Sequence, residues 1–216
     1  MNTWMAAGLF MIGMMGSGLA QDAGSIRLPP PETAGGMPLM QALQARRSSR
    51  EFAGRPLPPQ LLSNLLWAAN GVNRPDSGKR TAPSARDWRE IDVYVTTAEA
   101  AYRYDPATHT LTQVATGDLR RLTGVQDFVA TAPMNLVYVA DLDRTSDDDA
   151  PERKARFVAA DAGFIAQNVY LFCASAGLAT VVRGLVDPVA LGKALRLGPR
   201  QQVVLAQSVG YPAGGR

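Results

Sequence analysis

The chain has only one cysteine, Cys173, and one histidine, His109, among its 216 residues. A single cysteine cannot form an intramolecular disulfide, and Cys173 lies in an apolar stretch, where a free cysteine behaves as a small buried hydrophobe. We interpret His109 as a solvated residue in a turn between two strands. This scarcity disfavours zinc sites and Cys-His catalysis. We therefore predict no metal site and expect any chemistry to be supplied by a cofactor.

A strong charge bias is also missing, since 22 basic residues face 19 acidic ones and the formal net charge is +3. The basic residues are spread along the chain and form neither a concentrated face nor a binding motif. We therefore predict no nucleic-acid binding. Hydrophobic residues make up 46% of the chain and charged residues 19%, a composition typical of a globular domain.

The first twenty residues contain no charged side chain. Their apolar run, Trp4 to Leu19, is shorter than the roughly 20 residues that span a bilayer. Small residues at Gly18 and Ala20 fit the cleavage pattern of a secretory signal peptide. The missing Lys and Arg at the start leave an uncleaved anchor or a misassigned start codon as alternatives. We predict that residues 1–20 are a cleaved signal peptide and that the protein is exported, to the periplasm.

Residues 21–36 are rich in proline and glycine and predict an extended N-terminal arm. Residues 37–216 then form the predicted folded domain. Apolar spacing predicts helices over 37–45 and 60–69, the second beginning at Pro58-Pro59. Residues 71–83 have the composition of a loop.

Alternating apolar and polar residues predict a half-buried strand over 91–96, and 101–104 with 110–114 predict a hairpin. Further strands are expected over 135–140 and 203–209. The longest helix is predicted over 152–176, ending at Gly177. Its apolar character is interrupted by polar residues, which indicates a core helix and no membrane span. Asp187 as N-cap predicts a last helix to Leu197. Central strands flanked by helices favour an α+β fold.

Three segments carry candidate chemistry, and the first contains Arg46, Ser48 and Arg50. In an extended chain these side chains share one face, while Arg47 points to the other. Two guanidinium groups and a hydroxyl suit a phosphate with an adjoining polyol. A solvated cluster that stabilises a helix C-terminus remains the alternative for this segment alone.

The second segment is residues 81–88 and contains Pro83, Ser84 and Ala85, and the third is residues 177–184 and contains Val182, Arg183 and Gly184. Ser84 after Pro83 would by itself be interpreted as a helix N-cap. Gly184 permits a close approach of the backbone to a ligand, although the segment alone would pass for a core strand followed by a turn.

Taken in order, the three segments resemble the nitroreductase-like family of FMN-dependent oxidoreductases, over about residues 38–212. In that family an Arg-x-Ser-x-Arg/Lys stretch binds the phosphate, ribityl chain and ring edge of FMN. The resemblance thus implies cofactor binding by this stretch: Arg46, Arg47, Ser48 and Arg50. It makes Arg50 the candidate for a cation beside the flavin ring.

The family's Pro-Ser loop lies near the flavin and across the dimer interface, and Pro83, Ser84 and Ala85 match it. A later segment packs on the flavin ring and offers a backbone N–H to its reactive nitrogen; the residues that match by position are Val182, Arg183 and Gly184. A further basic contact to the phosphate would be Arg216, because the chain ends soon after Pro212.

The resemblance implies a nitroreductase-like α+β fold, with a central, mostly antiparallel sheet flanked by helices, and a homodimer with a long buried interface helix. Bound FMN would pass a hydride or two electrons between a small-molecule donor and acceptor, without a catalytic side chain. Two alternatives are an exported FMN-binding electron-relay protein and a module that has lost its flavin. The intact Arg46, Ser48 and Arg50 count against the second alternative.

The Pro-Ser loop departs from the family's common pattern, which continues with an Asn and then Gln-Pro-Trp. This chain has Asp87 and Arg89 there and no proline. It looks closer to a subgroup related to the azoline-oxidising dehydrogenases of peptide biosynthesis. The departure leaves the preference for nicotinamides and nitroaromatics open.

Overall fold

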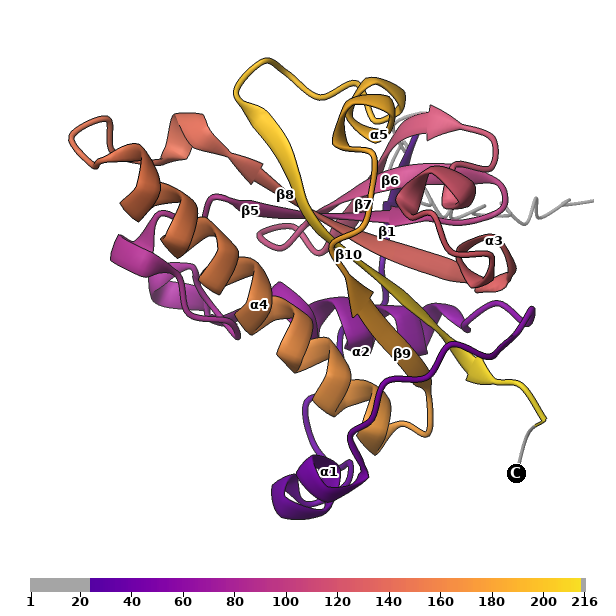
Figure 1. Ribbon diagram of the computed structural model, residues 1–216. Coiled ribbons are helices and arrows are strands. Elements are labelled where there is room, and N and C mark those ends of the chain that lie inside the picture. The colour runs from indigo at the N-terminus through magenta and orange to yellow at the C-terminus, as the bar shows by residue number, and fades with distance from the viewer. Residues whose placement is uncertain (1–23, 215–216) are drawn as a thin grey trace, which may run out of the picture.

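The computed structural model describes residues 24–214. The predicted signal peptide, residues 1–20, and Arg216 lie outside this range. Within it, the strands of the main sheet run in the order β1-β7-β6-β5-β8-β10-β2, with β9 on β10 (Figure 1). In the same order the strands are β1 (Ser25–Arg27), β7 (Thr110–Thr116), β6 (Ala100–Asp105), β5 (Ile91–Thr96), β8 (Met134–Asp141), β10 (Gln201–Pro212), β2 (Phe52–Ala53) and β9 (Ala179–Arg183).

Every strand pair described in this sheet is antiparallel, and helices pack on both faces. The predicted α+β fold with a central antiparallel sheet is therefore confirmed. The α-helices are α1 (Leu39–Ala45), α2 (Pro59–Asn70), α3 (Phe128–Thr131), α4 (Pro151–Ser175) and α5 (Pro188–Ala194). Short 3-10 turns occupy Pro75–Ser77, Ala85–Asp87, Arg120–Thr123 and Leu142–Arg144.

Helix ends follow local sequence signals. Pro59 stands in the first turn of α2, where its missing N–H needs no partner. The Asp187 side chain accepts hydrogen bonds from the N–H groups of Val189 and Ala190 at the start of α5. Gly177 ends α4 with a φ of 67°, and the Leu178 N–H donates to the Cys173 carbonyl over 2.8 Å, a left-handed C-terminal cap.

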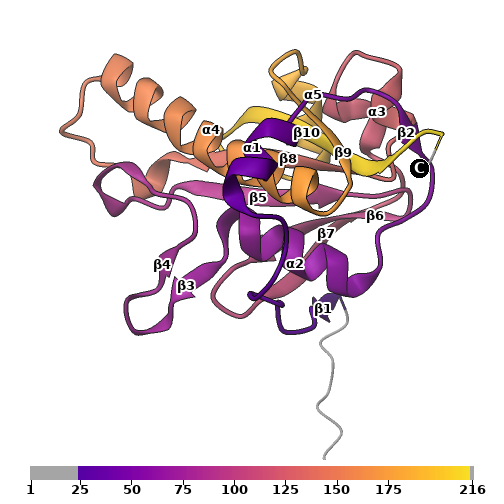
Figure 2. The ribbon, with the colours of Figure 1, turned by 90° about the horizontal axis from the view of Figure 1, so that it is seen from below.

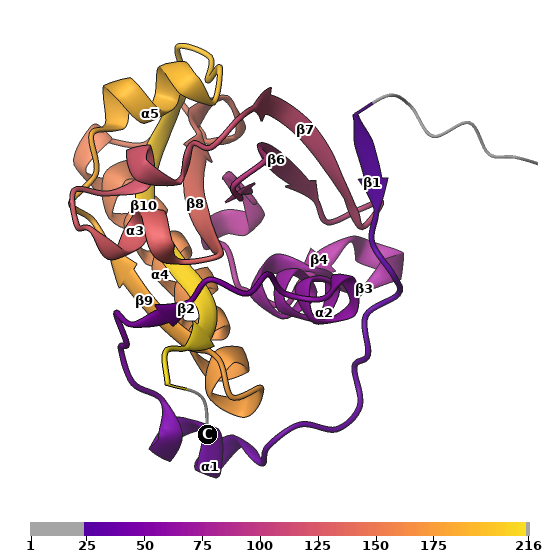
Figure 3. The ribbon, with the colours of Figure 1, turned by 90° about the vertical axis from the view of Figure 1, so that its right-hand side faces the viewer.

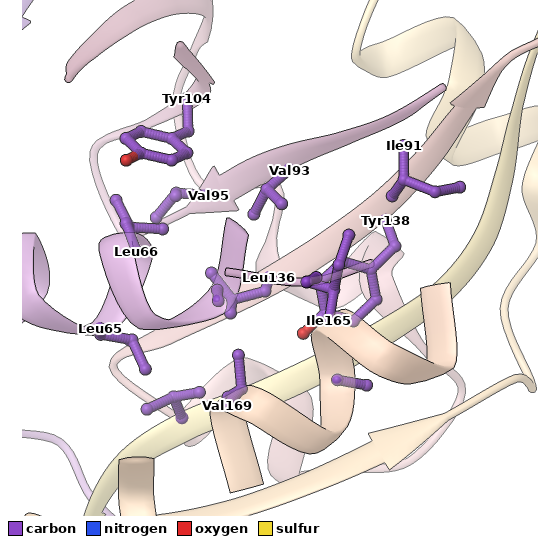
Figure 4. Close-up of a cluster of buried hydrophobic side chains, with 14 of the residues drawn as sticks. Leu65, Leu66, Ile91, Val93, Val95, Tyr104, Leu136, Tyr138, Ile165 and Val169 are labelled. Carbon is purple, nitrogen blue, oxygen red and sulfur yellow. The ribbon is translucent and has the colours of Figure 1, made fainter. Parts of the chain in front are cut away.

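The main core lies between the sheet and the pair α2 and α4. Leu65 and Leu66 of α2, with Ile165 and Val169 of α4, pack with side chains of β5 and β8 (Figure 4). Burial of such aliphatic side chains stabilises the fold by about 1.5–3 kcal/mol each. This core fixes α4 against the sheet and so sets the positions of its polar side chains.

The other face of the sheet is covered by α5, where Leu191 and the C-cap residue Leu195 pack on Val137, Val139 and Tyr94. All six residues of β5 are consequently buried, so the prediction of a half-buried strand was wrong. Two polar residues of β5, Asp92 and Thr96, are hydrogen-bonded instead of solvated. The Asp92 carboxylate accepts two hydrogen bonds of 2.8 Å from Arg144.

Two loop interpretations also change. Residues 71–83 contain a small antiparallel hairpin of β3 (Val72–Arg74) and β4 (Lys79–Arg80). His109 does occupy a turn, with a φ of 54°, but its ring is not solvated as predicted. Its two nitrogens lie 2.7 Å from Ser63 Oγ and 2.8 Å from Tyr104 Oη. Burial lowers the pKa of this histidine, and its ring bridges the hairpin and α2.

The N-terminal arm is joined to the domain. Its residues 25–27 form β1, an edge strand on β7, and Figure 3 shows the chain continuing past α2 to α1. Along this path the carbonyl groups of Pro29 and Pro30 accept hydrogen bonds from Ser63 and Gln60 of α2. The arm thus extends the sheet and tethers α2.

Helix α4 is long and apolar enough to cross a membrane by length and composition alone. Its buried side chains, which include Val158, Ala162, Ile165 and Val169, instead form a stripe that packs into the domain core. Near its C-terminal end it contacts α1, with which it lies side by side (Figure 2).

Candidate functional site

Tyr170, on the buried side of α4, joins two of the three candidate segments. Its phenol oxygen lies 2.8 Å from Ser48 Oγ and accepts a hydrogen bond of 2.9 Å from the Val182 N–H. The Arg46 guanidinium lies over the Tyr170 ring, 5.4 Å from its centre, within the range of a cation–π contact. Residues far apart in the sequence therefore meet around one side chain.

The stretch after α1 is extended, and its side chains alternate as predicted. Arg46 and Ser48 contact Tyr170, whereas Arg47 and Ser49 line a neighbouring pocket of about 310 Å³. The Ser49 N–H donates to the Thr180 carbonyl over 2.9 Å, which fixes the stretch alongside β9. Spacing alone did not show that Arg47 faces a pocket; Arg50 is exposed.

The pocket lies between this stretch and the junction of α4 with β9. Its walls combine two side chains of α4, the turn at Gly177 and the start of β9. The residues of these walls are Tyr170, Ala174, Gly177, Leu178, Ala179 and Thr180. A concave surface with few polar groups and one arginine is suited to part of an anionic ligand.

Arg183 of the third segment contributes its backbone rather than its side chain on this side of β9. The Arg183 side chain is buried and donates hydrogen bonds to Ser208 Oγ, Asn135 Oδ1 and two oxygens of Thr123, over 2.8–3.1 Å. Burial lowers the pKa of Arg183 to about 10. Because this guanidinium is held in the protein interior, only the backbone of Arg183 is available to a ligand near Tyr170.

Val182 and Gly184 flank Arg183. Val182 is partly buried, and its N–H is held by Tyr170. Gly184 is exposed, and a methyl group built on it would meet Leu205 at 3.7 Å, an ordinary contact. The space around Gly184 therefore does not by itself require glycine.

The Pro-Ser loop lies elsewhere on α4. The Ala85 N–H donates to Asp161 Oδ2 over 2.8 Å, and Asp161 precedes Tyr170 by nine residues, or about 14 Å along a helix axis. Within one chain, Pro83, Ser84 and Ala85 are thus not part of the cluster around Tyr170.

Backbone strain is concentrated after this loop. Arg86, Asp87 and Arg89 have φ values of 53°, 57° and 52°, in the left-handed region that non-glycine residues rarely adopt. Such conformations cost free energy and persist where contacts enforce them. Here the Arg89 N–H donates to Ser84 Oγ over 2.8 Å, and Arg86 pairs with the buried Asp149 at 2.9 Å.

Two buried carboxyl groups lie under the loop. Ser84 Oγ donates to Glu90 Oε2 over 3.2 Å, and both Glu90 and Asp161 line a second cavity together with Pro83 and Ser84. Burial raises the pKa of Glu90 to about 7, and the neighbouring Asp161 acts in the same direction. A carboxyl group of this kind can hold a proton near neutral pH.

The sequence profile described as Nitroreductase family matches residues 43–211. The chain belongs to the nitroreductase family. A nitroreductase-like protein of Methanocaldococcus jannaschii is 34% identical over 173 residues, which cover 76% of this chain and 85% of that protein.

Solved structures agree with the family assignment. A nitroreductase-like protein of Ralstonia eutropha is 44% identical, with a TM-score of 0.84 over 96% of this chain and 97% of its own. The NADPH:FMN oxidoreductase of Vibrio harveyi, solved with NAD+, is 20% identical, with a TM-score of 0.61 over 82% of this chain and 70% of its own. The second likeness is one of fold. As a member of the nitroreductase family, the protein is an oxidoreductase.

Sequence reasoning missed three residues of this nitroreductase-family chain. Tyr170, Glu90 and Asp161 were not among the candidates, although Asp161 is one of the polar residues that interrupt the apolar character of the predicted helix 152–176. The one feature of the sequence that could have indicated this site was an aspartate on a core helix, because a buried carboxyl group needs a partner. Cys173, in contrast, is buried as predicted, and burial raises the pKa of its thiol.

Proposed function

We propose that the protein is an exported FMN-dependent oxidoreductase that passes a hydride or two electrons between a small-molecule donor and acceptor. The observation that carries this proposal is the cluster around Tyr170. There, two of the segments that resemble the family's flavin-binding segments meet through Ser48 and the Val182 N–H. That meeting is expected if the segments hold one ligand.

The charges around the cluster fit a phosphate. Arg46, Arg47 and Arg50 lie within five positions, and none of them pairs with a carboxylate in residues 24–214. Unpaired guanidinium groups bind phosphate through two parallel hydrogen bonds. Arg46 and Arg47 would hold the phosphate, Ser48 a hydroxyl of the ribityl chain, and Arg50 a position nearer the ring.

FMN, when bound, supplies the acceptance and return of the hydride or electrons. The chain's residues bind and orient it, and the backbone of Val182, Arg183 and Gly184 would lie against its ring. Positive charge at Arg50 would favour the more negative, reduced form of the ring. The name of the Vibrio harveyi enzyme includes FMN, which supports this flavin for a protein of the same fold.

The proposal includes a homodimer. Pro83, Ser84 and Ala85 are about 14 Å along α4 from the Tyr170 cluster, so a partner subunit would have to bring this loop to the flavin. Apolar side chains are exposed on α1 and α4, with exposed fractions of 63% for Leu39, 75% for Met40 and 45% for Phe164. Their burial against a second copy would remove this apolar surface from water.

The absorbance spectrum of the purified protein tests the proposal. We expect a yellow protein whose released cofactor co-elutes with FMN, and oxidation of a reductant coupled to reduction of a quinone or nitroaromatic compound. A colourless protein that does not bind added FMN would contradict the proposal. Bound FMN without turnover of any small molecule would favour the electron-relay alternative.

A further inference from the structure

Arg183 carries a positive charge inside the protein without a carboxylate to balance it. The residue belongs to β9 and is only 7% exposed. Its guanidinium donates to four oxygens, all of them neutral: Ser208 Oγ, Asn135 Oδ1, Thr123 Oγ1 and the Thr123 carbonyl. It takes part in none of the ion pairs within residues 24–214. The cation is therefore held by neutral dipoles alone.

The surroundings of this guanidinium make its charge costly. Its Nε is buried without a hydrogen-bond partner among the described residues, and its carbon lies 5.7 Å from the centre of the Phe128 ring. Burial lowers the pKa of Arg183 to about 10, against a smaller opposing effect of the Tyr138 phenol. The side chain is consequently still protonated at neutral pH. Because buried charges are normally paired, the missing negative charge points to a partner outside the described chain.

The backbone of the same residue belongs to the segment proposed to lie against the flavin ring. The preceding N–H, that of Val182, is bonded to Tyr170 in the candidate site. The guanidinium of Arg183 reaches instead to β8, to β10 and to the turn Arg120–Thr123. The charge thus lies behind β9 in the protein interior, where salt screens it much less than it screens an exposed charge.

We propose that the buried cation of Arg183 stabilises the reduced, anionic form of the flavin and so raises the flavin's reduction potential. The inference rests on the proposed function. Uptake of two electrons and one proton by a neutral flavin ring leaves one negative charge on it. For unit charges about 10 Å apart and an effective dielectric constant of about 20, Coulomb's law favours the reduced form roughly tenfold. No contact between the guanidinium and the ring is needed.

The hydrogen bonds of Arg183 can be separated from its charge. The Ser208 hydroxyl also donates to Asn135 Oδ1, so these two side chains stay paired when the guanidinium is removed. Replacing a buried charged group by an apolar side chain of similar volume is often neutral or stabilising. Arg183→Met is therefore expected to fold. Arg183→Gln provides a second neutral variant that can still form a hydrogen bond.

The reduction potential of bound FMN, measured by potentiometric titration of the purified protein, tests the inference. Arg183→Met and Arg183→Gln should lower the preference for reduced over oxidised FMN about tenfold, which lowers the potential by about 30 mV for a two-electron couple. Arg183→Lys keeps the charge and should restore most of the potential. Ser208→Ala, which removes a neutral partner and keeps the charge, is the matched control and should leave the potential unchanged.

Salt distinguishes this buried charge from that of the exposed Arg50. At about 1 M salt the screening length falls to about 3 Å, so the shift caused by Arg50→Ala should shrink while that of Arg183→Met persists. A wild-type potential in both neutral variants, or an equal loss in Arg183→Lys or Ser208→Ala, would overturn the inference. A yellow Arg183→Met protein with an unchanged potential defeats this inference alone. A wild-type protein that does not bind FMN defeats the proposed function as well.

Discussion

The hydroxyl groups of Ser48 and Tyr170 lie 2.8 Å apart, although 122 positions separate them in the sequence. The same Tyr170 oxygen accepts from the Val182 N–H, so a single phenol links the stretch after α1 to β9. Removing the hydroxyl should therefore disturb both the local packing and the proposed flavin site.

We expect Tyr170→Phe to lower the free energy of unfolding by about 1–3 kcal/mol, because the Val182 N–H loses its partner. FMN binding should weaken by about tenfold. Urea denaturation and titration with FMN measure the two effects. Tyr102→Phe, which changes a tyrosine on β6, is the control, and an equal loss in both variants would refute the special role of Tyr170.

The arginines after α1 should differ in their effects. Arg46→Ala and Arg47→Ala should each weaken FMN binding by about one to two decades, since each removes charge-assisted hydrogen bonds to the phosphate. Arg50→Ala should also lower the flavin reduction potential, because it removes positive charge near the ring. FMN titration and a potentiometric titration measure these changes, with Arg27→Ala as control. If Arg46→Ala and Arg47→Ala both leave FMN binding unchanged, these arginines do not hold the phosphate.

Much of the fold could be predicted because its signals are local. Pro58-Pro59 begins α2, Gly177 ends α4, and Asp187 caps α5. Each of these signals depends on backbone geometry within one turn. The hairpin around His109 was likewise evident from two short strands and a turn.

What could not be predicted depends on contacts between distant segments. Strand β5 alternates in polarity but is buried on both faces, because Arg144 pairs with Asp92 and α5 covers Tyr94. The bond between Ser48 and Tyr170 and the closeness of Glu90 to Asp161 are likewise set by tertiary packing. Resemblance identified the stretch after α1, yet only the structure shows that Arg47 faces a pocket.

Assembly can be tested through the exposed apolar side chains of α1. Light scattering should report twice the subunit mass of 23.1 kDa, less any removed signal peptide. Met40→Glu should shift the protein toward monomer, because it places a charge in the proposed interface. Val189→Glu on α5 is the control, since Val189 is 79% exposed and Met40 75%. A stable, flavin-loaded monomer of the wild-type chain would refute the dimer.

Export is a prediction on residues 1–20, which lie outside the described part of the chain. We expect protein recovered from the cell envelope to begin near Gln21, since the apolar run ends in a small-x-small pattern at Ala20. N-terminal sequencing measures this directly. Met1 retained on cytoplasmic protein would contradict both cleavage and export.

The buried Glu90 should make stability depend on pH. Its pKa is raised from 4.5 to about 7, so the folded state binds a proton that the unfolded state has released between these values. The resulting stabilisation is fully present below about pH 4.5 and is lost as the pH rises through about 7. A shift of this size corresponds to about 3 kcal/mol.

Glu90→Gln keeps a neutral, hydrogen-bonding side chain and removes the titration. We expect its free energy of unfolding to exceed that of the wild type by on the order of 2–3 kcal/mol at pH 8, and the difference to close toward pH 5. Urea denaturation at pH 5, 6, 7 and 8 measures it. Glu51→Gln, an exposed carboxylate, should follow the wild-type curve. If the wild-type and Glu90→Gln curves run parallel across this range, Glu90 does not hold a proton in the folded protein.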